Sequence, residues 1–121
     1  MSTFEKVREI LAEILDFDKE EISLESYLIR ELTAESIDLL EVALELSLKF
    51  GIEVQDDDLF LRNLRSILMD ATQRGLNPIT AIVEKLPHLN KERVEEMLDD
   101  LKKGPVLKVQ DLVSYVEYSC P

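Results

Sequence analysis

Hydrophobic positions recur at helical spacing along most of the chain. From Phe4 onward, apolar side chains return every three or four residues, as they do on one face of a helix. Only three glycines and four prolines interrupt this pattern, and the remaining composition favours helix over strand. We therefore predict an all-α fold. The predicted helices are residues 2–16, 35–50, 57–74, 78–86, 91–103 and 109–118.

Polar and small residues stand where the predicted helices begin and end. Ser2 and Glu5 have the spacing of a capping box. Asn77 precedes Pro78, which is the order of a helix cap and a first-turn proline. Gly51 stands where a left-handed residue commonly ends a helix. These local signals agree with the boundaries that the periodicity gives.

Residues 16–26, after the first predicted helix, are polar and irregular. A long ordered loop of this kind is usually pinned by apolar side chains. Ile22 and Leu24 are the predicted inward anchors. A short apolar cluster follows them, made of Tyr27, Leu28, Ile29 and Leu32.

The predicted helix at 35–50 is apolar on more than one side. Such a helix must bury a second face, in the core, against a partner or beneath another segment of the chain. The side that we expect to line the core carries Leu39, Val42, Ala43, Leu46 and Phe50. The other side carries Ile37, Asp38, Leu40, Glu41 and Leu44.

The charge of the chain restricts its partners. There are 26 acidic and 14 basic side chains, a net charge of −12, which disfavours nucleic acid and anionic membrane surfaces. The same charge favours proteins that present basic patches. No apolar run is long enough to span a membrane, no secretory signal is expected, and the single Cys120 indicates a reducing compartment. We expect a cytoplasmic monomer.

The residues offer no catalytic or metal site. No nucleophile and base can be paired, and His88, the only histidine, is predicted to be a loop residue. Asp56, Asp57 and Asp58 lack the further ligands of a calcium loop and suit a helix start instead. We predict that the protein is not an enzyme and holds no metal.

Ser36 lies in the run that opens the 35–50 helix, Glu31-Leu32-Thr33-Ala34-Glu35-Ser36-Ile37-Asp38-Leu39-Leu40-Glu41. This run resembles the phosphopantetheine attachment segment of acyl carrier proteins, and the helix behind it ends in the similar Phe50-Gly51. Roughly residues 3–55 and 105–118 resemble that family. Three residues depart from its pattern: Thr33 replaces the usual glycine, Glu35 the usual aspartate and Ile37 the usual leucine. The first departure leaves the local turn shape open, and all three point to a restricted set of partner enzymes.

The resemblance implies a function and a site. A phosphopantetheinyl transferase would attach 4′-phosphopantetheine from coenzyme A to Ser36. Acyl groups would then be bound to the thiol of this arm as thioesters. The fold would be a single up-and-down helical bundle over residues 1–121, with a long first loop and a helical insertion at about 57–104. The insertion favours a specialised lipid or secondary-metabolite pathway over general fatty acid synthesis, and the cargo stays open. The alternative is an unmodified acidic interaction domain of the same fold.

The resemblance also assigns roles to the two faces of the 35–50 helix. Partner enzymes with basic patches, which load or transfer acyl groups, would meet Glu35, Ile37, Asp38, Leu40, Glu41 and Leu44. The acyl pocket would be lined by Leu39, Val42, Ala43, Leu46 and Phe50. Burial of Leu40 and Leu44 beneath the insertion is the other possibility.

Overall fold

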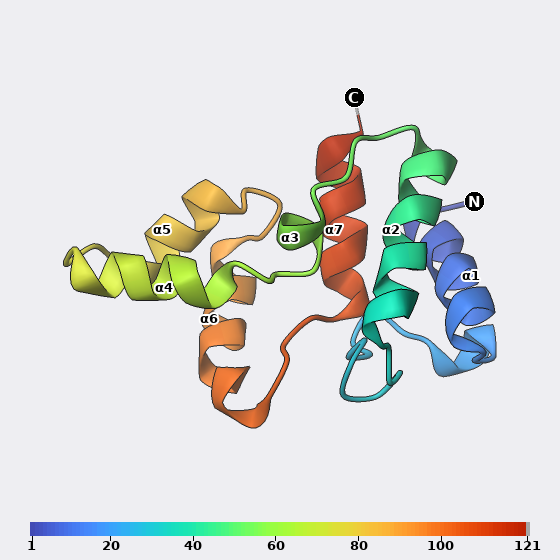
Figure 1. Ribbon diagram of the computed structural model, residues 1–121, viewed down its shortest axis with the longest axis horizontal. Coiled ribbons are helices and arrows are strands. Elements are labelled where there is room, and N and C mark those ends of the chain that lie inside the picture. Colours follow the sequence, from blue (N-terminus) through green and yellow to red (C-terminus); the bar gives the residue numbers. More distant parts are fainter. Residues whose placement is uncertain (121) are drawn as a thin grey trace.

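Three helices form a bundle at one end of the molecule. The computed structural model describes residues 1–120, and it places α1 (Thr3–Leu15), α2 (Ser36–Phe50) and α7 (Val109–Ser119) side by side (Figure 1). The short helix α3 (Asp56–Leu59) packs against α7. Seven α-helices, two short 3₁₀ turns (Lys19–Glu21 and Leu101–Lys103) and no strand occur within residues 1–120, so the all-α prediction is confirmed.

The predicted caps hold the ends of the helices. The Glu5 N–H donates to the Ser2 hydroxyl at 3.1 Å, and Gly51 ends α2 with φ +62°. The Asn77 and Asn90 side chains accept from main-chain N–H groups at the starts of α5 (Pro78–Lys85) and α6 (Lys91–Asp100). These ends were predictable because each cap is local in sequence.

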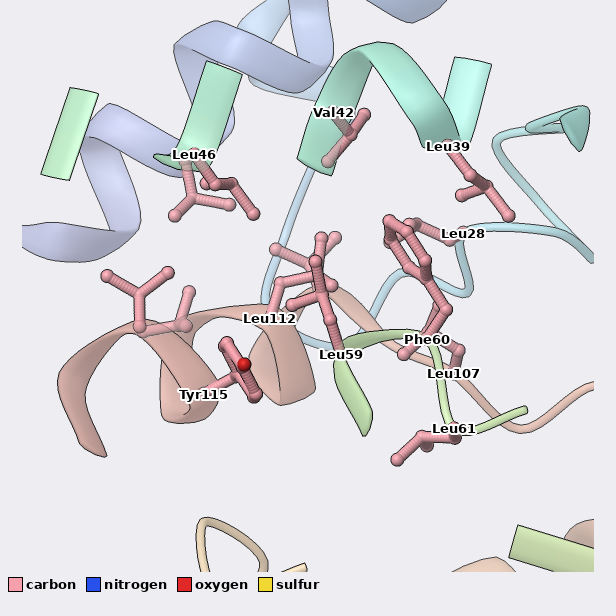
Figure 2. Packing of buried hydrophobic residues seen from close by; sticks show 14 of the residues in the cluster. Leu28, Leu39, Val42, Leu46, Leu59, Phe60, Leu61, Leu107, Leu112 and Tyr115 are labelled. Carbon is pink, nitrogen blue, oxygen red and sulfur yellow. The ribbon is translucent and has the colours of Figure 1, made fainter. Parts of the chain in front are cut away.

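The prediction of one helix over 57–74 is wrong. The chain forms α3 and α4 (Leu64–Gln73), separated by a turn in which Leu61 has φ +58°. A left-handed residue cannot continue an α-helix. The turn redirects the chain: Leu59 enters the bundle (Figure 2), whereas Leu64 begins α4.

Helices α4, α5 and α6 form a second layer, which we call the α4–α6 unit. Figure 1 shows it on the far side of α3 and α7 from α1. Helix α5 packs on both α4 and α6. The buried residues of the unit include Leu64, Ala71, Ile82, Val94 and Met97. All of these except Ala71 belong to the same hydrophobic cluster as the bundle.

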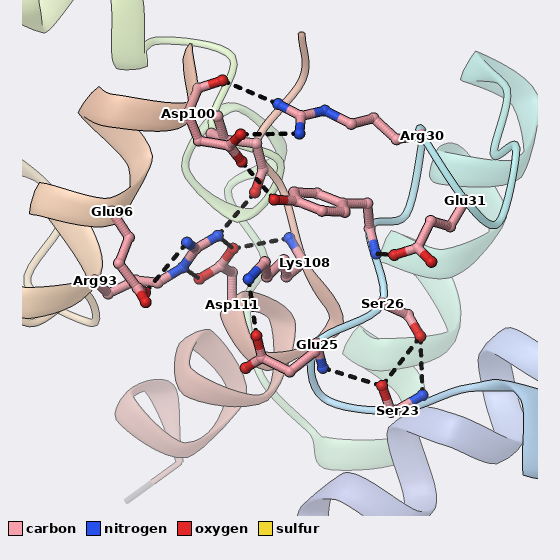
Figure 3. A network of polar contacts seen from close by, with 12 residues as sticks. Ser23, Glu25, Ser26, Arg30, Glu31, Arg93, Glu96, Asp100, Lys108 and Asp111 are labelled. Atoms are coloured by element: carbon pink, nitrogen blue, oxygen red, sulfur yellow. Dashed lines mark hydrogen bonds and ion pairs between the residues drawn. The ribbon is translucent and has the colours of Figure 1, made fainter. Parts of the chain in front are cut away.

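A buried ion pair joins the α4–α6 unit to α7. Arg93 Nε and Nη2 donate to the two carboxylate oxygens of Asp111, each at 2.8 Å, and Nη2 also donates to the Val106 carbonyl (Figure 3). The Lys108 N–H donates to Asp111 as well, at 2.8 Å. Burial works to lower the pKa of Arg93, but the hydrogen bond and charge of Asp111 outweigh it and the pKa is raised.

A second polar cluster ties the α4–α6 unit to the first loop. Asp100 accepts from the Tyr27 hydroxyl and from Arg30 Nη1, the latter at 3.0 Å, while Arg30 Nη2 donates to the Gly104 carbonyl at 2.9 Å. The hydrogen bond from Tyr27, together with Arg30, lowers the pKa of Asp100. Both clusters join residues that are far apart in the sequence.

The first loop follows the prediction only in part. Ile22, Leu28 and Leu32 are buried at 3% exposure or less, but Leu24 is 41% exposed and is not an inward anchor. Leu24 instead uses its main chain, because its carbonyl accepts from the Gln110 N–H at the start of α7. Ile29 is also exposed, at 37%.

Candidate functional site

Ser36 is the first residue of α2, and its side chain is exposed. The helix start is held by Asp38, whose carboxylate accepts from the Glu35 N–H at 2.9 Å. The hydroxyl is therefore presented to solvent on an ordered helix end.

The start of α2 suits a phosphodiester. Leu39 supplies the first N–H that bonds back to Glu35 within the helix, so the amides of Ser36 and Ile37 precede the helical ladder. Such free amides and the positive end of the helix dipole stabilise an anionic group. The residues at this position thus fit a phosphate attached to Ser36.

Thr33 shapes the turn before Ser36. Its φ of +54° lies in the left-handed region, which favours glycine and strains a β-branched residue. The Ala34 N–H closes the turn by donating to the Leu28 carbonyl at 3.0 Å. The turn therefore keeps a backbone conformation suited to glycine although threonine occupies it.

The two faces of α2 differ sharply in exposure. Leu39, Val42, Ala43 and Leu46 are buried at 7% exposure or less, and Phe50 is partly buried. The opposite face is an exposed apolar stripe, defined by Ile37 (65%), Leu40 (57%), Leu44 (59%) and Leu48 (68%).

The α4–α6 unit leaves this exposed stripe uncovered. Leu40 and Leu44 remain solvent-exposed, so the alternative that the insertion buries them is wrong. Leu48 was missed by the sequence analysis, although its spacing of four residues from Leu44 continues the same stripe.

Carboxylates flank the stripe. Glu35 and Glu41 are exposed and Asp38 is partly exposed. A groove of about 390 Å³ between α1 and α2 is lined by further acidic side chains, which the sequence analysis did not single out. They are Glu9, Glu13 and Glu45, beside Glu41 and Lys49.

His88 lies apart from Ser36, at the junction of the α4–α6 unit with α7. It is in the turn between α5 and α6, so the prediction of a loop residue is confirmed. Its ring packs edge-on against Tyr115, with centroids 5.2 Å apart, and is half-buried rather than free in solvent. Burial lowers the pKa of His88, and the charges of Asp111 and Asp58 only partly oppose this.

The three aspartates at 56–58 begin α3, as predicted. Asp58 accepts from the Asn63 side-chain amide at 2.9 Å. Over residues 1–120, no three histidine, cysteine or acidic side chains are placed to hold a metal ion. None of the helices in that range is both long and apolar enough to cross a bilayer.

Comparisons with known proteins agree with this site. Residues 5–68 match the family described as "Phosphopantetheine attachment site". The chain is 38% identical over 58 residues to an acyl carrier protein of Campylobacter jejuni subsp. doylei, covering 48% of this chain and 75% of the relative. It is 40% identical over 58 residues to an acyl carrier protein of Helicobacter hepaticus, covering 48% of this chain and 76% of the relative. No solved structure matches the chain.

The family match includes Ser36 and the whole of α2. Proteins of this family are carriers rather than enzymes, and they hold 4′-phosphopantetheine covalently. The chain belongs to the acyl carrier protein family.

Proposed function

We propose that Ser36 is the residue that carries 4′-phosphopantetheine and that the protein presents acyl groups to partner enzymes of one dedicated lipid or secondary-metabolite pathway. The observation that supports this most is the exposed Ser36 side chain at the start of α2, inside the family-matched residues 5–68. When bound, the arm supplies a thiol that holds the acyl group as a thioester. A transferase provides the catalysis, so Ser36 needs no neighbouring base.

The exposed stripe of α2 is proposed as the surface that partner enzymes contact. Ile37, Leu40 and Leu44 offer apolar contact, and the same stripe continues to Leu48. The carboxylates of Glu35, Asp38 and Glu41 border it and would face basic patches. Such charges speed and orient the encounter more than they add affinity.

The α4–α6 unit is the reason to propose a dedicated pathway, because it adds surface beyond the bundle that holds Ser36. It lies away from α2 and leaves the stripe uncovered, so partner enzymes can still contact the stripe (Figure 1). A cytoplasmic monomer stays a prediction of the sequence.

The test is loading of the purified protein with coenzyme A and a promiscuous phosphopantetheinyl transferase, read by intact mass. We expect the mass of one phosphopantetheinyl group to be added to the wild type and to Ser66→Ala, which removes another exposed serine. Ser36→Ala should gain nothing. An unmodified wild type, or equal gain in Ser36→Ala, contradicts the proposal.

The second candidate is an interaction domain of the same fold that is never modified. The strained Thr33, with Glu35 and Ile37 beside Ser36, is the observation that favours it. Intact mass of the protein purified from its own cell separates the two candidates. Fully unmodified Ser36 there favours the second.

A further inference from the structure

A groove with an apolar floor and a basic rim runs along the junction between the first loop, the α3–α4 turn and the segment that leads into α7. We call it the seam groove, and its volume is about 270 Å³. Most of its lining is apolar, including Ile29, Leu61 and Leu101. Within residues 1–120, the charged residues of this lining are Arg62 and Arg65, and none is acidic. Such a lining is unexpected in a chain whose net charge is −12.

Hydrogen bonds hold the walls of the seam groove in place. The Leu28 N–H donates to the Leu107 carbonyl at 3.1 Å, which joins the first loop to the segment before α7. Arg30 Nη2 donates to the Gly104 carbonyl at 2.9 Å, and Arg30 Nη1 donates to Asp100 at 3.0 Å. The groove therefore exists before a guest arrives, and binding requires little reordering of these walls.

The two arginines of the rim are available to a guest. Arg62 Nη1 is 3.9 Å from Asp57, but both side chains are at least 44% exposed, so this ion pair holds Arg62 only weakly. The Arg62 guanidinium lies 5.5 Å from the centroid of the Phe60 ring, at the edge of the groove. Arg65 is exposed, and its side-chain hydrogen bond within residues 1–120 goes to the Leu101 carbonyl, at 3.4 Å.

Two lysines add positive charge beside the rim. Lys102 and Lys103 follow Leu101 in the 3₁₀ turn of one wall, and both are exposed. Asp100, which precedes this turn, is already engaged by the hydroxyl of Tyr27 and by Arg30. The surface around the seam groove is therefore basic, in contrast to the acidic groove between α1 and α2.

The lining predicts the chemistry of the guest. Its volume lies just below the range of about 300–1,000 Å³ for sites of drug-sized molecules, so it suits an anchoring apolar side chain. Arginine binds carboxylates well, because two parallel N–H groups can donate to both oxygens.

The charge of the whole chain restricts the source of those carboxylates or other anions. Nucleic acid, an anionic membrane and a second copy of this chain are all extended and negatively charged, so they also meet its acidic remainder. A short acidic segment is affected mainly by the local rim, because salt screens charges beyond about 8 Å at physiological ionic strength.

We infer that the seam groove is a second docking surface, which binds a segment of a partner protein that has acidic residues beside an apolar anchor. The exposed stripe of α2 is proposed for partners with basic patches, so the two surfaces select partners of opposite charge. The inference goes beyond the proposed function, and it does not require modification of Ser36, which is not part of the lining. The connection from α6 to α7 has a role in this docking because it forms one wall.

The test measures the fluorescence anisotropy of a labelled peptide titrated with the unmodified full chain. The peptide has a central leucine-phenylalanine pair between runs of glutamate, and a matched peptide has glutamine in place of every glutamate. We expect the glutamate peptide to bind about tenfold more tightly or better, and to bind more weakly as salt is added. No saturable binding of the glutamate peptide, or equal binding of the two peptides, overturns the inference.

Two variants of equal net charge locate the binding site. Arg65→Glu reverses a charge of the rim, whereas Arg74→Glu reverses an exposed arginine outside the groove. Arg65→Glu should weaken binding of the glutamate peptide by about tenfold or more, and Arg74→Glu by about twofold or less. An equal loss in both variants contradicts binding in the groove.

Nuclear magnetic resonance of the unmodified wild type keeps the test independent of variants. The glutamate peptide should shift the amide signals of Ile29, Arg65 and Gly104, whereas shifts confined to Leu40 and Leu44 overturn the inference. Binding to phosphatidylserine vesicles, or self-association, that Arg65→Glu abolishes assigns the groove to a membrane or to a second copy and also overturns it. None of these measurements involves loading, so their failure leaves the proposed function of Ser36 untouched.

Discussion

The buried pair of Arg93 and Asp111 predicts a large and specific loss of stability in Arg93→Met. The Arg93 side chain is 8% exposed and that of Asp111 is 1% exposed. Methionine keeps much of the apolar stem but removes both hydrogen bonds to Asp111 and the one to Val106. Asp111 then retains only the Lys108 N–H as a partner. Removal of one member of a buried pair costs about 3–5 kcal/mol because the other charge is left uncompensated.

Urea denaturation followed by circular dichroism measures this loss. The expected decrease is a large share of the total free energy of unfolding, which is about 5–15 kcal/mol for a domain. Arg74→Met is the matched control, because Arg74 pairs with Asp70 at 3.4 Å while both side chains are at least 60% exposed. That exposed pair contributes about 1 kcal/mol or less.

A double variant tests the physical reason. Replacement of a whole buried pair by apolar residues is often neutral, so Arg93→Met with Asp111→Leu should be more stable than Arg93→Met alone. The reasoning is refuted if Arg93→Met unfolds within about 1 kcal/mol of the wild type. It is also refuted if the double variant is no more stable than the single one.

Three further predictions concern the turn, the junction and the stripe. Thr33→Gly removes about 1–2 kcal/mol of left-handed strain from the folded state but loses about 0.4–1 kcal/mol because glycine makes the unfolded chain freer. Urea denaturation should therefore show a small net increase in the free energy of unfolding. Thr33→Ala, which keeps the strain, should not show this increase. The folded-state pKa of His88 lies below its ordinary 6.5, so the unfolded state binds the proton more readily. The contribution of His88 to the free energy of unfolding should therefore be fully present above pH 6.5. Below pH 6.5 it should fall by at most about 1.4 kcal/mol per pH unit. Urea denaturation of His88→Gln over the same pH range should show a weaker dependence of stability on pH. Leu44→Asp should lower kcat/KM for loading by about tenfold or more if the transferase buries this leucine. Leu24→Asp, which changes an exposed leucine outside the stripe, should leave kcat/KM unchanged. Equal kcat/KM in the two variants excludes the stripe as the surface that the transferase contacts.

The parts of the fold that the sequence predicts are those encoded locally. The Ser2 cap and the Gly51 end of α2 each depend on neighbours within a few residues, so pattern and spacing identify them. The 57–74 helix failed because periodicity shows that residues are apolar but not which body they face. Leu59 ends α3 and Leu64 begins α4, and the left-handed Leu61 lies in the turn between them.

The polar contacts at the junction could not be predicted in the same way. Arg93 lies among acidic residues on the predicted 91–103 helix, and the apolar residues of that helix already account for its buried face. Nothing in the neighbouring sequence therefore indicates that the Arg93 side chain is buried. Its partner Asp111 is 18 residues away, and Tyr27 and Asp100 are 73 residues apart. Ser36 was identified differently, through the resemblance of its flanking run, and its exposure in the structure is a separate observation.

Charge is distributed unevenly between the part of the chain that holds Ser36 and the part that contains the α4–α6 unit. Residues 1–61 contain 17 acidic and 5 basic side chains, whereas residues 62–108 contain 7 acidic and 9 basic ones. The acidity of the chain therefore belongs to the part that holds Ser36 and the exposed stripe. A partner with a basic patch is steered toward α1 and α2 and away from the α4–α6 unit. The stripe of α2 stays open to such a partner, because Leu40 and Leu44 remain exposed beside the α4–α6 unit.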